Sequence, residues 1–106
     1  MKFLVMTTRR QGVPIPPEAI ARLLTAQREW FEEHLADGTI DCAYGYPQGG
    51  GGVGIANAKT TEELNELVTS FPLFPIADIE VRPLTDINVA LENGAKALER
   101  IAHATA

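Results

Sequence analysis

The stretch YPQGGGGVGIANA, residues 46–58, decides between two folds, because Gly49, Gly51 and Gly54 have the spacing G-x-G-x-x-G. In a dinucleotide-binding loop, this spacing joins a strand directly to a helix whose N-terminus holds the pyrophosphate. Here the glycines lead into VGIAN, which is typical of a strand, and the next helix cap comes only at Thr60. A chain of 106 residues is also too short for two mononucleotide-binding halves. The pattern therefore favours a turn between two strands over a phosphate-binding loop.

The last two glycines of this stretch have a different role from those in the turn. Gly52 and Gly54 alternate with Val53 and Ile55, so they lie on one face of the predicted strand and leave it without side chains. We interpret them as residues that clear space over the sheet.

The flanking segments complete a β-α-β-β-α-β pattern. Pro17 suits the first position of a helix and Gly38 its end, while Thr60 and Glu63 form a T-x-x-E capping box for a second helix. With a helix added at the C-terminus, this order is the ferredoxin-like α+β arrangement, in which two helices cover one face of a four-stranded antiparallel sheet. The predicted elements are strands 2–8, 39–46, 52–57 and 77–84, and helices 17–37, 60–69 and 86–104. We expect a single domain over 1–106, with its core in 1–84 and a helical extension in 85–106.

Composition excludes several classes of function. The net charge of −5 and the scattered basic residues argue against a nucleic-acid partner. No apolar run reaches the roughly 20 residues that a membrane span needs. Cys42 is the single cysteine, so no internal disulfide can form, and no Cys/His cluster indicates a metal. We expect a cytoplasmic protein that uses neither metal nor cofactor.

The first strand is apolar on both faces, with Phe3 and Val5 on one and Leu4 and Met6 on the other, although two helices can cover only one face. Strict alternation along the second strand puts a second set of side chains on a common face, namely Ile40, Cys42, Tyr44 and Tyr46. An open apolar face of this size is unusual on a soluble monomer. Either the C-terminal helix folds across it, or two copies pair sheet to sheet around a cavity. The amount of apolar surface favours the homodimer.

Residues 62–84, EELNELVTSFPLFPIADIEVRPL, resemble the corresponding region of the muconolactone δ-isomerases. The similarity rests on Pro72-Leu73-Phe74-Pro75 followed by Asp78-Ile79-Glu80-Val81, after a leucine-bearing helix. It extends more weakly back to the first strand and leaves the C-terminal helix unmatched. The resemblance implies a ferredoxin-like subunit that pairs as a dimeric α/β barrel. It also implies a cofactor-free shift of a proton and a double bond within a small unsaturated lactone.

The candidate catalytic residues are Asp78, Glu80 and Tyr44. The two carboxylates alternate with Ile79 and Val81, so they point away from the helices toward the face that a dimer would enclose, where one could act as base. The Tyr44 hydroxyl would then hold the carbonyl group of the ligand. The expected ligand-binding residues are apolar, aromatic or glycine: Leu4, Met6, Trp30, Cys42, Tyr46, Gly52 and Gly54.

Two other functions remain open. Leu4 and Met6 stand where the isomerases offer His and Lys, so the inner lining departs from the family. One alternative is therefore a non-catalytic dimer that serves assembly or regulation. The other is a cofactor-independent monooxygenase, a chemistry that barrels of this build also support.

Overall fold

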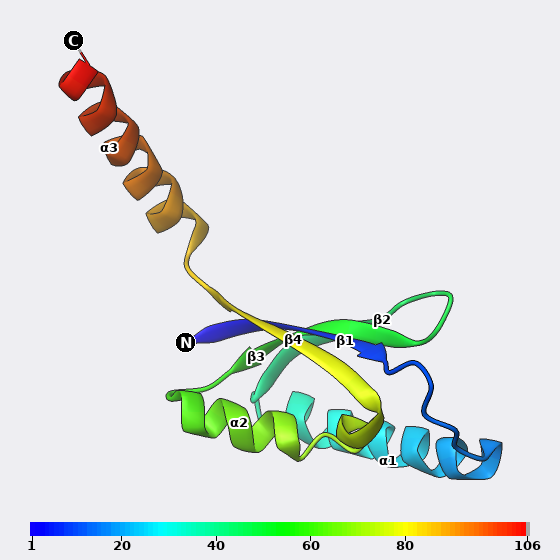
Figure 1. Cartoon of the computed structure of the whole chain (residues 1–106). Coiled ribbons are helices and arrows are strands. Elements are labelled where there is room, and N and C mark those ends of the chain that lie inside the picture. Colours follow the sequence, from blue (N-terminus) through cyan, green and yellow to red (C-terminus); the bar gives the residue numbers. More distant parts are fainter. Residues whose placement is uncertain (106) are drawn as a thin grey trace.

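A computed structural model of the chain describes residues 1–105 and contains a sheet of four strands with three helices. The order β-α-β-β-α-β plus a C-terminal helix is confirmed, and each predicted boundary lies within one residue of the observed one. The elements are β1 (Lys2–Arg9), α1 (Pro17–Ala36), β2 (Ile40–Gly45), β3 (Gly51–Asn57), α2 (Thr61–Thr69), the 3-10 turn η1 (Phe74–Ile76), β4 (Ala77–Leu84) and α3 (Ile87–Thr105) (Figure 1).

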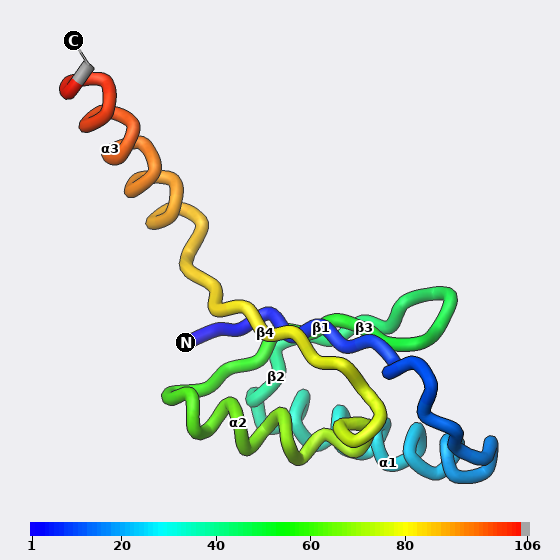
Figure 2. The backbone as a smooth tube through the Cα atoms, in the orientation of Figure 1, coloured from blue at the N-terminus to red at the C-terminus, as the bar shows by residue number. Residues whose placement is uncertain are grey.

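The sheet has the order β2-β3-β1-β4, and all neighbouring strands pair antiparallel. Helices α1 and α2 both lie on one side of this sheet, as the ribbon and the backbone trace show (Figures 1 and 2). Within residues 1–105, no helix lies on the other side of the sheet, and we call that side the open face. The fold is thus the ferredoxin-like α+β arrangement that the sequence predicts, with Gly49 and Gly50 in the β2–β3 hairpin loop and Gly51 and Gly52 at the start of β3.

The two helices that cover the sheet begin and end at the predicted signals. Pro17 occupies the first turn of α1, and Gly38, with a φ of +81°, follows the last residues of that helix. At the start of α2, the Thr60 hydroxyl accepts a hydrogen bond from the Glu63 backbone N–H at 3.1 Å. The Glu63 carboxylate accepts one in return from the N–H of Lys59 at 2.8 Å, one residue before the cap. Local sequence is sufficient to place both helices.

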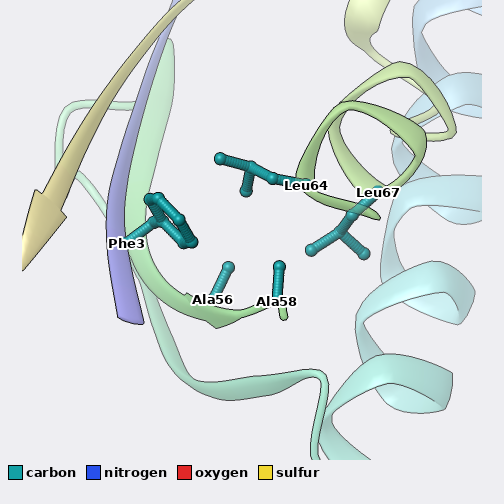
Figure 3. Packing of buried hydrophobic residues seen from close by; sticks show 5 residues of the cluster. All are labelled: Phe3, Ala56, Ala58, Leu64 and Leu67. Carbon is teal, nitrogen blue, oxygen red and sulfur yellow. The ribbon is translucent and has the colours of Figure 1, made fainter. Parts of the chain in front are cut away.

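The hydrophobic core lies between the sheet and α2. Phe3 on β1 and Ala56 on β3 point toward Leu64 and Leu67 on α2, with Ala58 beside them (Figure 3). Each of these side chains is at most 8% exposed. The partly buried residues that pack against this cluster are Val5, Trp30, Val68 and Val81.

A β-bulge at Asp41 corrects the predicted faces of β2. Ile40 pairs with Ala56, but Cys42 already pairs with Ile55, so Asp41 is an extra residue in the ladder. An extra residue shifts every later side chain to the other face. Ile40 is therefore buried on the helix side, while Cys42 and Tyr44 lie on the open face, and strict alternation was wrong for this strand.

Polar contacts hold the bulge. The Asp41 carboxylate pairs with the Lys2 ammonium and accepts a hydrogen bond from Asn57 Nδ2 at 2.7 Å. Hydrogen bonds from Lys2 first, and then from Asn57, lower the pKa of Asp41 below its ordinary value of 3.8.

We expect the Asp41 carboxylate to make stability depend on pH in acid. Because its pKa is lowered by folding, its contribution is fully present above pH 3.8 and is lost as the pH falls through the folded-state pKa. Asp41→Asn should therefore lower the free energy of unfolding at neutral pH, by an amount that shrinks steadily below pH 3.8. Urea titrations of both proteins across this range measure the difference. A gap that stays constant with pH would contradict this assignment.

Helix α3 does not fold across the open face, which removes one of the two arrangements predicted for it. It projects away from the sheet and from the other helices (Figure 1), and the molecule measures 65 × 32 × 26 Å. The carboxylate of Asp86 caps the helix by accepting a hydrogen bond from the Asn88 N–H at 2.9 Å. Large apolar side chains on α3 are exposed, among them Ile87 at 65%, Leu91 at 64% and Leu98 at 68%.

Candidate functional site

A cavity of about 740 Å³ lies between the helix side of the sheet and α1. The strands contribute Val5, Gly54 and Ala56 to its lining, and α1 contributes Gln27 and Phe31. The lining is mostly apolar and aromatic. This volume falls within the range of small-molecule sites, about 300–1,000 Å³.

The pairing of β1 with β3 places both predicted space-making glycines on the helix side. Gly54 pairs with Val5 and Gly52 with Thr7, so neither shares a face with Leu4 or Met6. A Cβ atom at Gly54 would lie 3.1 Å from the Cys42 carbonyl oxygen, a tight contact but one that a small shift relieves. A side chain at this position would extend over the helix side of β3, where the cavity lies. Gly54 therefore helps to form the cavity.

Gly52 is required for a different reason. A Cβ atom there would lie only 2.4 Å from the carbonyl oxygen of Tyr44. The backbones of β2 and β3 approach too closely at this point for any side chain. Gly52 lines the cavity, but its presence follows from the hairpin geometry rather than from the need for space.

Aromatic rings form one wall of the cavity. The Trp30 ring packs edge-to-face against Phe71, with centroids 5.2 Å apart, and against Phe31 at 5.1 Å. Its indole N–H donates a hydrogen bond to the Ser70 hydroxyl at 3.0 Å. These contacts hold the indole in place, so Trp30 presents a fixed apolar surface to the cavity, as does the neighbouring lining residue Phe71.

Gln27 is the buried polar residue of α1, at 5% exposure, and sequence reasoning missed it. Its Oε1 accepts a hydrogen bond from the Leu73 backbone N–H at 3.3 Å. Its Nε2 is buried and has no hydrogen-bond partner in the described part of the chain. The signal was present in the sequence, because position 27 falls at helical spacing between Leu24 and Phe31 on the predicted apolar stripe. A glutamine at such a position indicates a polar group that faces the interior.

The charged side chains that line the cavity form an ion pair. Arg28 Nε lies 3.3 Å from Glu32 Oε1, and both side chains are largely exposed. They mark the part of the cavity that meets solvent. Tyr46, one of the residues proposed from the sequence to bind a ligand, also lines the cavity.

The other predicted site residues lie on the open face. Leu4, Met6 and Cys42 are half-buried there, and Tyr44 is 71% exposed. The open face is thus apolar in its centre. Tyr44 and the backbone around it also reach the edge of the cavity.

The predicted catalytic residues share the open face but are not brought together. Pairing places Tyr44, Val53, Met6 and Glu80 in one row across the sheet. Three strand spacings therefore separate Tyr44 from Glu80, about 14 Å at 4.8 Å each. Asp78 pairs with Arg10 at 3.1 Å, and Glu80 with Arg82 at 2.8 Å. Both carboxylates point away from the helices, as expected, and both lie outside the cavity.

Within residues 1–105, no group of three or more His, Cys, Asp or Glu side chains is arranged to hold a metal ion. None of the helices in this described part is long and apolar enough to cross a membrane.

Comparison with known proteins identifies similar sequences and folds. The sequence profile of the muconolactone delta-isomerase family matches residues 1–88, which leaves all of α3 beyond its first residues outside the match. A crystal structure of muconolactone isomerase has a TM-score of 0.73 and 24% identity, covering 81% of this chain and 90% of that chain. No curated protein sequence matches this chain significantly.

A second solved structure is a 5-chloro-2-hydroxyhydroquinone dehydrochlorinase from Burkholderia phenoliruptrix AC1100, in complex with 2,5-dihydroxybenzoquinone. Its TM-score is 0.62 at 18% identity, with 80% of this chain and 94% of that chain covered. Both likenesses are likenesses of fold.

Proposed function

Because the chain belongs to the muconolactone delta-isomerase family, we propose that it binds a small, apolar, carbonyl-bearing molecule in the cavity between the sheet and α1. The reaction that we propose there is a cofactor-free isomerisation, in which a proton moves at a carbon next to the carbonyl group. The fold alone would not support this, because one fold hosts many functions.

The observation that carries the proposal is the cavity itself. Gly54 and Ala56 leave the middle of β3 without large side chains, and Trp30 and Phe31 on α1 form an apolar boundary on the other side. A scaffold protein whose interior served only packing would fill about 740 Å³ with side chains. An apolar space with few polar groups is typical of a site for a small organic ligand.

Proton transfer needs a base within reach of the ligand. Glu32 is the carboxylate among the cavity-lining residues, so we propose it as the candidate base for a ligand held there. If the ligand binds on the open face instead, the candidate catalytic residues are Asp78, Glu80 and Tyr44. That face would be enclosed only if a second copy covered it. A ligand in the cavity would require the Glu32 carboxylate for activity, whereas a ligand on the open face would require Asp78 or Glu80.

Self-association is the second part of the proposal. The centre of the open face carries Leu4, Met6, Val53 and Ile55, and α3 exposes further apolar side chains. Such surfaces on a soluble protein mark contacts with another chain. We propose a homodimer in which the open face and α3 are covered by the second copy.

The cavity can be tested with coumarin, a bicyclic unsaturated lactone of suitable size. Trp30 is the single tryptophan of the chain and lines the cavity, so its indole N–H resonance reports binding at this site. We expect saturable binding by the wild type. Gly54→Leu should weaken it by about tenfold or more, because the new side chain occupies the space of the ligand.

Gly94→Leu is the matched control, because a Cβ atom at Gly94 on α3 meets nothing within 4 Å. It should bind coumarin as the wild type does. A Trp30 resonance that does not move, or equal affinities for Gly54→Leu and the wild type, would contradict ligand binding in the cavity.

A further inference from the structure

We propose that the side-chain amide of Gln27 donates a hydrogen bond from Nε2 to the carbonyl oxygen of the bound ligand, and that the ligand is neutral. This inference rests on the proposed function, since it names the chemical class that the cavity accepts. The residue that recognises the ligand carbonyl group then lies on α1.

The orientation of the Gln27 amide is determined by its neighbour. Oε1 accepts from the Leu73 N–H at 3.3 Å, and an amide turned the other way would set two donors against each other. Nε2 must therefore be the end that has no protein partner. Leu73 belongs to the connection between α2 and η1, so two separate parts of the chain hold this amide in one orientation.

A buried donor without a partner is costly, because it has lost its hydrogen bonds to water and gained none. Gln27 is only 5% exposed and lines the cavity. An acceptor brought in by a ligand would remove this cost. A hydrocarbon of the same shape would leave it in place, so the cavity should discriminate between the two.

The charge of the lining indicates a neutral ligand. Arg28 is the guanidinium among the lining residues, and it pairs with Glu32 at 3.3 Å. A carboxylate on the ligand would have to compete with Glu32 for this partner and would lie close to it. Lactones, ketones and quinones without an acidic group fit this lining better than acids do.

The test compares coumarin with 2H-chromene, which has a CH2 group in place of the lactone carbonyl. We expect the wild type to bind coumarin at least about fivefold more tightly, as one neutral hydrogen bond allows. Gln27→Met should remove this preference while leaving the affinity for 2H-chromene unchanged. Gln48→Met, at an exposed glutamine in the β2–β3 loop, should keep the preference.

The outcomes separate this inference from the function on which it rests. If both compounds bind with equal affinity to the wild type, the role of Gln27 is wrong and ligand binding stands. If neither binds, the proposed function itself fails. If Gln27→Met lowers the affinity for both compounds by the same factor, Gln27 is a structural residue and the inference is overturned.

Two further measurements do not depend on whether Gln27→Met folds. The Gln27 side-chain NH2 resonances of the wild type should shift on addition of coumarin and stay in place with 2H-chromene. Coumarin-3-carboxylate should bind at least about fivefold more weakly than coumarin. Equal or tighter binding of the acid would overturn the neutrality of the ligand.

Discussion

Replacing Gly51 with alanine is expected to lower the free energy of unfolding by about 3 kcal/mol, because strain and overlap act together at this position. Gly51 has a φ of +147°, in a region that side-chain-bearing residues rarely adopt. A Cβ atom there would lie 2.0 Å from the carbonyl oxygen of Thr7, inside the pairing of β1 with β3. Relief would require the two central strands to move apart.

Gly50→Ala separates the two causes. Gly50 also has a positive φ, +81°, but its Cβ atom would meet nothing within 4 Å. Only the backbone strain applies to Gly50→Ala, so we expect its free energy of unfolding to fall by about 1 kcal/mol. Urea unfolding followed by Trp30 fluorescence measures both variants. Equal losses for Gly50→Ala and Gly51→Ala would show that the close approach to Thr7 does not constrain the hairpin.

Placing two charges on the apolar stripe of α3 should have the largest effect on assembly. Leu91 and Leu98 are 64% and 68% exposed and lie on one face of the helix, two turns apart. If the second copy covers this stripe, Leu91→Asp combined with Leu98→Asp buries two carboxylates in the contact. Each costs several kcal/mol, so the dissociation constant should rise by about 1,000-fold or more.

Light scattering on the purified protein measures this change directly. The wild type should have twice the 11.5 kDa mass of one chain, and the doubly charged variant the mass of a single chain. Asn93→Asp combined with His103→Asp also adds two carboxylates to α3, away from the stripe, and should remain dimeric. A wild type that is monomeric at micromolar concentration, or a doubly charged variant that remains a dimer, would refute the role of α3.

The sequence was sufficient for the elements and their order. Pro17, Gly38 and the Thr60–Glu63 capping box act within a few residues of chain, so each boundary they predict is set locally. Alternation of apolar residues along β1 and β4 also predicted correctly which face of the sheet each side chain joins, because both strands pair without irregularity. The resemblance to the isomerase family rested on a different local feature, residues 72–75 followed by 78–81, and the profile match over residues 1–88 bears it out.

The placement of the site was decided by tertiary structure. One extra residue at Asp41 turns Cys42 and Tyr44 to the face opposite Ile40. No periodicity in the sequence predicts this bulge. Gln27 falls on the apolar stripe of α1, but only the packing of α1 and of the segment around Leu73 leaves its Nε2 buried without a partner within the described residues. A local signal determines which backbone conformation a segment adopts. Which face a side chain joins, and whether its polar atoms find a partner, depends on strands and helices distant in the chain, and only their packing settles it.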